Sequence, residues 1–384
     1  MMKIRCRAFF DVNEKKLVEN AVIVVENGKI RDIGAAKGFS EKEGDLDLAD
    51  RFILPGFVDA HNHLCFDVGD EMAQIGEPLA YQALVGARNA LIAINSGVTL
   101  QRDAGEKGYT DFSLKRAIAE GKIAGPRLYV AGPSLMRTGG HMWYMGEEVD
   151  GEDEVRKGVR RQLRSGVDFI KVFVSGGATS QHTGTLTSEM TKREIEVVIE
   201  EAHTAGKRVG AHTHGGIAAT WTIEAGVDAV EHGCFFTETQ LEAMRERGTY
   251  LVSTSGIQRA IRDFESNSPF MRSKAGAAYE NYHSTIGKAL AMGLRIAVGN
   301  DTNHGCIAEE IEFLVKSGAS IEDAICSATI VGATLCEQEN ITGSIEVGKD
   351  ADFVVFDENP LEKIETLRNP SWVFRAGRVV KSPK

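Results

Sequence analysis

A helix end followed by a short apolar run recurs through the middle of this chain, and it constrains the fold more than any other feature. Glycine directly after a helix adopts the left-handed conformation that ends it. The apolar runs that follow are short enough to be buried parallel strands. The pattern occurs in NSGVTL (95–100), RSGVDFIKVFV (164–174), TAGKRVGAH (204–212), EAGVDAVEH (224–232), ERGTYLVST (246–254) and AMGLRIAVGND (291–301).

The segments between these strands have the pattern of amphipathic helices. In residues 191–206, Thr191 and Glu194 are placed for a capping box. Four apolar residues of that segment share one helical face: Ile195, Val198, Ile199 and Ala202. Eight strands are predicted, at 53–60, 98–103, 127–131, 169–174, 208–212, 228–231, 250–254 and 295–300.

Eight strand–helix units of this length predict an α/β fold of the (β/α)₈ TIM barrel type. A doubly wound open sheet is the alternative, but the sequence contains no G-x-G-x-x-G turn that would favour it. Residues 134–150 and 256–280 have weak periodicity and are predicted to be active-site loops.

The two ends of the chain have a different pattern. Residues 21–34 consist of a strand, an Asn-Gly turn and a second strand, and residues 343–384 repeat this style. Residues 1–54 and 344–384 are therefore predicted to form one composite β-sandwich domain, and residues 55–343 the barrel.

Composition excludes several classes of protein. The content of 42% hydrophobic and 26% charged residues is typical of a globular protein in water. A net charge of −11 argues against nucleic acid or an anionic membrane as the main partner, because both require clustered Lys and Arg. Six cysteines at irregular spacing suggest reduced thiols, and no apolar run reaches signal-peptide or membrane-span length, so we expect a cytoplasmic protein.

Two histidines, His61 and His63, end the first predicted barrel strand. Residues two apart on a strand point to one side. At the carboxyl end of a barrel strand that side is the mouth, where active sites of this fold lie. Converging neutral imidazoles suit Zn²⁺ or a similar ion, although two polar loop residues are an ordinary alternative for this pair alone.

Lys171 lies inside the apolar run of the fourth predicted strand. A buried ammonium without a partner is costly, and burial lowers its pKa. Three fates remain open: a structural ion pair, a Schiff-base nucleophile, or conversion by carbon dioxide to a carbamate that binds metal. Taken alone, the residue favours the ion pair.

Three later strands also deliver a residue of the ligand type at the same end: His212, His232 and Asp301. A buried structural histidine explains any one of them but not the set. Together with His61, His63 and Lys171, they predict a metal site at the mouth of the barrel.

This constellation resembles the amidohydrolase superfamily over nearly the whole chain. The motifs PGFVDAHNH, IKVFVSGG, AHTHG, VEHG and GND occur in the family order, and GSIEVGKDADFVVFD looks like the return of the chain to the terminal β domain. Since Lys171 is present, the resemblance implies the two-metal branch with a carboxylated lysine. The similar members are related to imidazolonepropionase and include Xaa-Pro and Xaa-Arg/Lys dipeptidases.

The resemblance also implies the role of each ligand. His61, His63 and Asp301 would hold one divalent ion, His212 and His232 a second, most simply both zinc, and carboxylated Lys171 would bridge them. A hydroxide shared by the ions would attack the carbonyl, Asp301 would transfer protons, and His141 would donate a hydrogen bond to the oxyanion. Where the family has Gly-Thr-Asp, this chain has Gly299-Asn300-Asp301.

Several residues near these motifs are weaker candidates. His214 is interpreted as a neighbour of the ligands, and His182 and His304 as loop residues near the mouth. His203 and His283 are expected to be structural. A substrate pocket could use residues from the predicted loops: Arg137, Trp143, Tyr144, Met145, Glu147, Glu148, Asp150 and Arg259.

These residues together predict a metal-dependent hydrolase of a C–N amide or peptide bond, with a dipeptide or other small molecule as substrate. A prolidase-like dipeptidase or an enzyme acting on N-acyl amino acids is the leading hypothesis. Hydrolysis of a cyclic amide, an imidazolone or a xenobiotic amide is the alternative. A barrel without catalysis that serves in assembly is the third. Similar proteins often assemble, so we expect a homo-oligomer.

Overall fold

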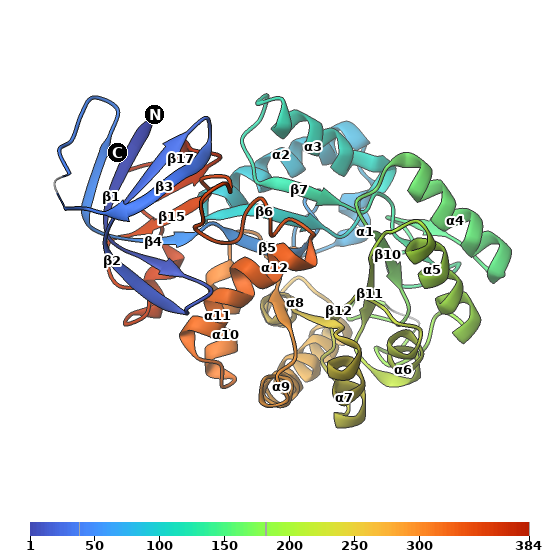
Figure 1. Cartoon of the computed structure of the whole chain (residues 1–384). Helices are drawn as coiled ribbons and strands as arrows, with labels where there is room; N and C mark the ends of the chain where they lie inside the picture. Colours follow the sequence, from blue (N-terminus) through green and yellow to red (C-terminus); the bar gives the residue numbers. More distant parts are fainter. Residues whose placement is uncertain (38, 181–182, 384) are drawn as a thin grey trace.

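Strands from both ends of the chain form one sheet. The computed structural model describes residues 1–37, 39–180 and 183–383. The sheet has the order β17-β16-β15-β4-β1-β2-β3 and lies beside the parallel strands (Figure 1). Its strands are β1 (Met2–Asp11), β2 (Lys16–Glu26), β3 (Lys29–Ala35), β4 (Leu46–Pro55), β15 (Phe353–Phe356), β16 (Trp372–Arg375) and β17 (Arg378–Lys381).

Antiparallel pairing of β4 with β15 joins the two ends, with Leu54 opposite Val354. Inward-facing apolar residues of this sheet form their own core, which includes Ile4, Ile23 and Phe353. The other face of the sheet packs in the main core, to which Phe10, Leu54 and Val354 belong.

The parallel strands lie in two further sheets, one of the order β5-β6-β7 and one of the order β14-β13-β12-β11-β10-β8-β9. The α/β class with parallel strands is confirmed, but the backbone pairing of the described residues does not join them into one ring. The strands are β5 (Phe57–Asn62), β6 (Val98–Asp103), β7 (Arg127–Val130), β8 (Leu135–Met136), β9 (Glu147–Glu148), β10 (Ile170–Phe173), β11 (Val209–Thr213), β12 (Ala229–His232), β13 (Tyr250–Ser253) and β14 (Ile296–Val298).

Single contacts link the two parallel sheets. At one junction an isolated parallel bridge joins Asn62 to Asp301. At the other, the backbone N–H of Asp168 donates to the carbonyl of Val130 at 2.9 Å.

Helices lie around the outside of the parallel strands (Figure 1). No helix of the described ranges is long and apolar enough to cross a membrane. The helices are α1 (Glu71–Gly76), α2 (Leu79–Asn95), α3 (Thr110–Ala119), α4 (Gly151–Ser165), α5 (Lys192–Thr204), α6 (Gly216–Glu224), α7 (Glu238–Arg247), α8 (Ser255–Asp263), α9 (Pro269–Ala291), α10 (Ile307–Lys316), α11 (Ile321–Cys326) and α12 (Gly332–Leu335).

Helix α5 confirms the pattern that was expected of these helices. The Thr191 side chain accepts from the backbone N–H of Glu194, and the Glu194 carboxylate accepts from the backbone N–H of Thr191, so the capping box is present. The predicted apolar face of the helix is buried.

The first parallel strand begins later than predicted, at Phe57 instead of residue 53. Residues up to Pro55 belong to β4 of the terminal sheet. Gly56 lies between the two strands, and an added Cβ there would lie 2.2 Å from the Thr99 hydroxyl oxygen. The apolar run therefore contains two strands, which separate where the chain passes between the sheets.

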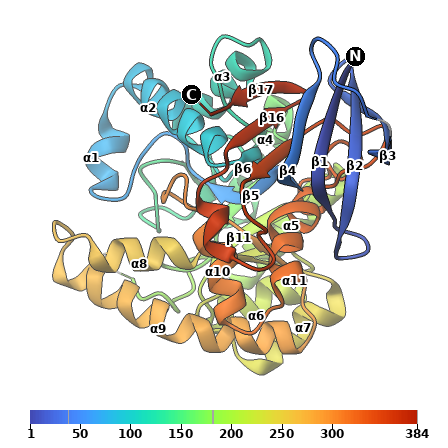
Figure 2. The ribbon, with the colours of Figure 1, turned by 90° about the vertical axis from the view of Figure 1, so that its left-hand side faces the viewer.

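The prediction of a loop over residues 256–280 was wrong, because most of this range is helical. Helices α8 and α9 form a hairpin that extends from one side of the molecule (Figure 2). The start of α9 had a recognisable sequence signal, since the Ser268 side chain caps the helix and Pro269 follows at its first position.

Gly299 permits the close approach of the last parallel strand to the first. An added Cβ would lie 2.7 Å from the backbone N and 2.8 Å from the backbone O of His61. Because backbone atoms cannot move aside cheaply, we expect Gly299→Ala to lower the free energy of unfolding by about 2 kcal/mol. Denaturant unfolding measures this change.

Gly276→Ala is the matched control for that substitution. Gly276 lies within α9, and the nearest atom to an added Cβ is 3.6 Å away on the Arg262 side chain. Alanine should raise the unfolding free energy there by about 0.5 to 1 kcal/mol. Equal stability of Gly299→Ala and the native chain would contradict the inference that a side chain at residue 299 clashes with the backbone of His61.

Candidate metal centre

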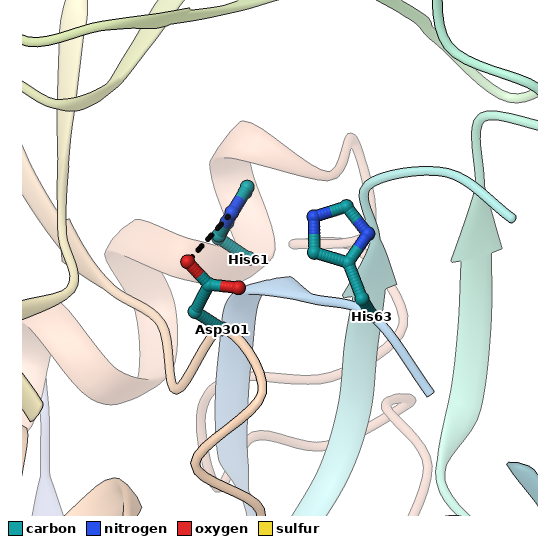
Figure 3. A group of neighbouring side chains, drawn as sticks. All are labelled: His61, His63 and Asp301. Atoms are coloured by element: carbon teal, nitrogen blue, oxygen red, sulfur yellow. Dashed lines mark ion pairs between the residues drawn. The ribbon is translucent and has the colours of Figure 1, made fainter. Parts of the chain in front are cut away.

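Three predicted ligands from the two ends of the parallel sheets meet at one point. His61 belongs to β5, His63 follows it, and Asp301 follows β14. Their ligand atoms all lie within 4.8 Å of one another, and Figure 3 shows both rings beside the carboxylate. His61 Nε2 lies 3.7 Å from Asp301 Oδ2. Two imidazoles and a carboxylate at this spacing can hold a divalent ion.

The histidines present free nitrogen atoms to this point. Neither ring nitrogen of His61 has a hydrogen-bond partner among the described residues, although the side chain is buried. His63 Nδ1 lies 2.9 Å from the carbonyl of Gly105, a contact that fixes the tautomer and leaves Nε2 free. Burial lowers the pKa of His63 to about 3, so its imidazole is neutral, as metal binding requires.

Asp59 explains why the first and last parallel strands meet here. Its carboxylate accepts from the side-chain amides of Asn62 at 2.7 Å and Asn300 at 3.0 Å. It also accepts from the backbone N–H of Asn300 at 3.0 Å. Asn300, the residue that departs from the family pattern, thus fastens the turn that carries Asp301 to β5.

Asp301 is held in a conformation that few residues adopt. Its φ is 56°, in the left-handed region. Its backbone N–H donates to the His61 carbonyl at 2.8 Å, which maintains that geometry. Burial would raise the pKa of Asp301, but His61 and His63 hold it below its ordinary value, so the carboxylate is ionised.

A second group of imidazoles lies beside the first. The ring centroids of His212 and His232 are 4.5 Å apart, and His61 lies 5.1 Å from His232. His232 has a φ of 73°, and its Nδ1 lies 2.7 Å from the Thr254 hydroxyl, so Nε2 is available. Burial, followed by the neighbouring imidazoles, lowers the pKa values of His212 and His232 well below the ordinary value.

His141 and His214 border this second group. The ring of His141 lies 4.5 Å from that of His212, and its Nδ1 lies 3.0 Å from the Ser180 hydroxyl. His214 stacks on His232 at 5.1 Å. Burial lowers the pKa of His141 to about 3 and that of His214 to about 4, so both rings are neutral.

Lys171 lies fully buried on β10 and forms an ion pair with Glu231. A structural ion pair is one of the three fates predicted for this lysine. Glu231 also accepts from Arg102 at 2.8 Å. Burial lowers the pKa of Lys171 although Glu231 opposes the shift. Burial raises the pKa of Glu231, but Lys171 and Arg102 outweigh it and hold the pKa well below its usual range.

The sequence interpretation missed Glu231 and Arg102. Glu231 follows two apolar residues in the short strand AVEH, a signal that could have identified it. Arg102 lies between Gln101 and Asp103 in VTLQRD, where no such signal exists. Glu231 and its neighbour His232 both border His61: Glu231 Oε1 lies 3.7 Å from His61 Nδ1, and the ring centroids of His61 and His232 are 5.1 Å apart.

A cavity that opens to solvent lies over these residues. Its wall contains five of the six predicted ligands, all but Lys171, together with His141 and His214. The remaining wall residues are Phe66, Glu71, Met142, Phe173, Ala178, Thr179, Ile257, Gln258 and Ile261. Helix α8, where the sequence predicted a loop, supplies the last two isoleucines and Gln258.

The structure places the three acidic pocket candidates in other contacts. Glu147 pairs with Arg161, and the carboxylate of Glu148 accepts from the Gly139 N–H at 2.7 Å. Asp150 binds Thr138. None of the three belongs to the described wall residues of the cavity.

The other pocket candidates also lie mostly outside the wall. Trp143 is 45% exposed, Met145 is buried in a small apolar cluster, and Arg259 pairs with Glu309. Arg137 is absent from the described wall residues. Tyr144 contacts the wall residue Glu71, with 3.1 Å between the hydroxyl and the carboxylate.

The remaining histidines have structural partners. His304 Nε2 lies 2.9 Å from the carbonyl of Phe66, and His203 pairs with Asp228. His283 lies within α9 and its Nδ1 is 2.9 Å from the Ser317 hydroxyl. His182 lies outside the described residues.

The pairing of Glu231 with two buried cations predicts a large effect on stability. In the metal-free protein with an unmodified Lys171, we expect Glu231→Gln to lower the free energy of unfolding by about 3 kcal/mol, because Lys171 and Arg102 lose their counter-charge in the interior. Glu238→Gln is the control, since its pair with Lys288 is 63% exposed on the Glu238 side. Denaturant unfolding of both variants measures the difference, and similar values would rule the argument out.

Comparison with known proteins gives one consistent family. Ochratoxinase from Aspergillus niger is 29% identical over 367 residues, which cover 86% of this chain and 76% of the relative. Imidazolonepropionase from Syntrophobacter fumaroxidans is 22% identical over 377 residues, covering 86% and 80%. A crystal structure of a Xaa-Pro dipeptidase with methionine in its active site is 30% identical, has a TM-score of 0.90, and covers 99% of this chain and 100% of that one. Residues 52–380 match the Amidohydrolase family, and the chain therefore belongs to this family, as its motifs predicted.

Proposed function

We propose that this protein is a metal-dependent hydrolase of a C–N amide bond, of the dipeptidase or prolidase-like kind. The observation that carries the proposal is the convergence of His61, His63, His212, His232 and Asp301 on one end of a cavity, next to buried Lys171. Most of these groups are neutral imidazoles. Several neutral imidazoles gathered this closely are typical of a metal site.

The ligand assignment follows the two groups of side chains. His61, His63 and Asp301 hold one ion, and His212 and His232 hold the second. Divalent ions held there, in our proposal zinc, would activate water and polarise a carbonyl group. The unpartnered nitrogens of His61 support this assignment, because a buried imidazole without a ligand or hydrogen bond is costly.

Carboxylation of Lys171 completes the proposed site. The neutral amine attacks carbon dioxide, the new N–C bond forms a carbamate, and one proton leaves to solvent. Burial favours the neutral amine that this reaction needs. The amine must leave Glu231 to react, and Arg102 remains to neutralise that carboxylate.

Two side chains would handle the reacting groups. Asp301 is ionised, so it can accept the proton of the attacking water and return it to the leaving nitrogen. His141 is neutral and lies beside His212, where it can donate an N–H to the carbonyl oxygen as negative charge develops.

The cavity wall suits an amide with an apolar portion. Met142, Ile257 and Ile261 contribute apolar surface to the same wall as the imidazoles. The names ochratoxinase and Xaa-Pro dipeptidase indicate that these relatives act on different substrates. A cyclic amide, imidazolone or xenobiotic amide is the second candidate, which the likeness to imidazolonepropionase favours.

The finer organisation of the chain is part of the same proposal. We infer that the two parallel sheets are arcs of one (β/α)₈ barrel spanning 55–343, because the Asn62–Asp301 bridge lies at one junction. Residues 1–54 and 344–384 form the composite β domain in this division. A homo-oligomer in the cytoplasm remains our expectation.

Lys171→Ala tests the bridging role. We expect loss of turnover by a factor of about 10³ or more, since an unbridged pair of ions would be misplaced, together with a lower metal content. Acetate or propionate should restore part of both, because a small carboxylate can take the place of the carbamate. Metal analysis and amide hydrolysis measure the two effects.

Lys288→Ala is the control, because it also replaces one lysine by alanine, but at the surface of the molecule. Full metal content and full turnover in Lys171→Ala would refute the role of Lys171. A screen of Xaa-Pro, Xaa-Arg and N-acyl amino acids against imidazolone-type rings separates the two candidate functions.

A further inference from the structure

Glu71 is an acidic wall residue that the proposed chemistry does not use. It begins α1, in the segment that follows β5, and lines the cavity together with Asp301. Its carboxylate accepts from the Tyr144 hydroxyl at 3.1 Å. The Thr179 hydroxyl also contacts it. Two neutral hydroxyls therefore orient the Glu71 carboxylate without neutralising its charge.

The cations near the cavity are bound to other groups. No Lys or Arg lines the wall formed by the described residues. The ammonium of Lys274 binds the carbonyls of Ser180 and Thr183, each at 2.7 Å. Lys107 binds the carbonyl of Ile75 at 3.2 Å. In the described part of the chain, Glu71 thus has no cationic partner.

An acidic group in this position is unfavourable without a counter-charge. Burial, followed by repulsion from Asp301, raises the pKa of Glu71 to about 7. A cation that enters the cavity would reverse both effects, because it replaces water around the carboxylate with a direct charge partner. Among the described residues, the same wall contains no Lys or Arg to attract a substrate anion.

We propose that Glu71 is a specificity-determining residue that binds a protonated amine of the substrate. The inference rests on the proposed function and narrows its substrate class to amides that carry an ammonium group. The ammonium can be the free α-amino group at the N-terminus of a short peptide or the end of a basic side chain. Both sources have the same charge and the same hydrogen-bond donors.

Binding of three amino-acid-sized acids distinguishes these sources without any hydrolysis. Norleucine, lysine and 2-hydroxyhexanoic acid have equal main-chain length and contain no amide. Tighter binding of lysine than norleucine indicates the side-chain ammonium, and tighter binding of norleucine than 2-hydroxyhexanoic acid indicates the α-ammonium. We expect at least one of these preferences to reach about tenfold in the metal-loaded protein, as measured by calorimetry.

Glu71→Gln should reduce that preference to less than twofold while leaving the affinity for the less favoured acid unchanged. Glu77→Gln is the matched control, because Glu77 is an exposed carboxylate at the other end of the same helix. It should retain the full preference. Glu71→Asp keeps the charge on a shorter side chain and should retain part of it.

Two results would overturn the inference: equal binding of all three acids by the native protein, or an undiminished preference in Glu71→Gln. The first needs no variant, so a folding defect cannot obscure it. Failure of the proposed function is a different outcome, in which the native protein hydrolyses no amide of the screen although the ammonium preference is present.

Discussion

The site depends on the hydrogen bonds of Asp59, which fasten the turn after the last parallel strand to the first one. The carboxylate binds Asn62 and Asn300, and this brings His61 and Asp301 together. At this junction of the two parallel sheets, the described backbone forms one isolated β-bridge, between Asn62 and Asp301. Burial raises the pKa of Asp59 to about 7, and its amide and N–H donors oppose that shift. The network lies beneath the candidate ligands, so their spacing is set by groups that would not themselves touch an ion.

A second group of buried charges stabilises the centre of the molecule. Lys171, Glu231 and Arg102 come from three different strands and neutralise one another where water is excluded. The guanidinium of Arg102 also lies 3.8 Å from the ring centroid of Phe169, so its planar face is covered. Such a group adds little net stability compared with apolar residues, but it orients each member closely. It therefore serves the geometry of the site more than the strength of the fold.

Much of this architecture could be predicted from short-range patterns. Glycine after a helix and a short apolar run located six of the eight predicted strands to within about two residues, the strand at 127–131 was also located, and residues at or near the strand ends identified the candidate ligands. The first strand was misplaced because β4 and β5 form one continuous apolar run, which only tertiary pairing divides. Residues 256–280 were predicted to be an active-site loop, and α8 from this range does line the cavity, but its helical form was missed. Glu71 could not be assigned to the cavity, because the position of the short helix α1 depends on tertiary packing. Glu231, by contrast, was visible as a charge beside apolar residues in the strand AVEH.

The terminal sheet has a consequence for how the chain is made. During synthesis β4 emerges some 300 residues before its partner β15. Until then β4, which already pairs with β1 on one edge, presents its other edge as an open row of backbone donors and acceptors. Exposed strand edges invite pairing with other chains. The nascent protein is thus most vulnerable to aggregation late in translation, when the parallel strands are complete and the open edge of β4 still lacks its three partner strands β15, β16 and β17.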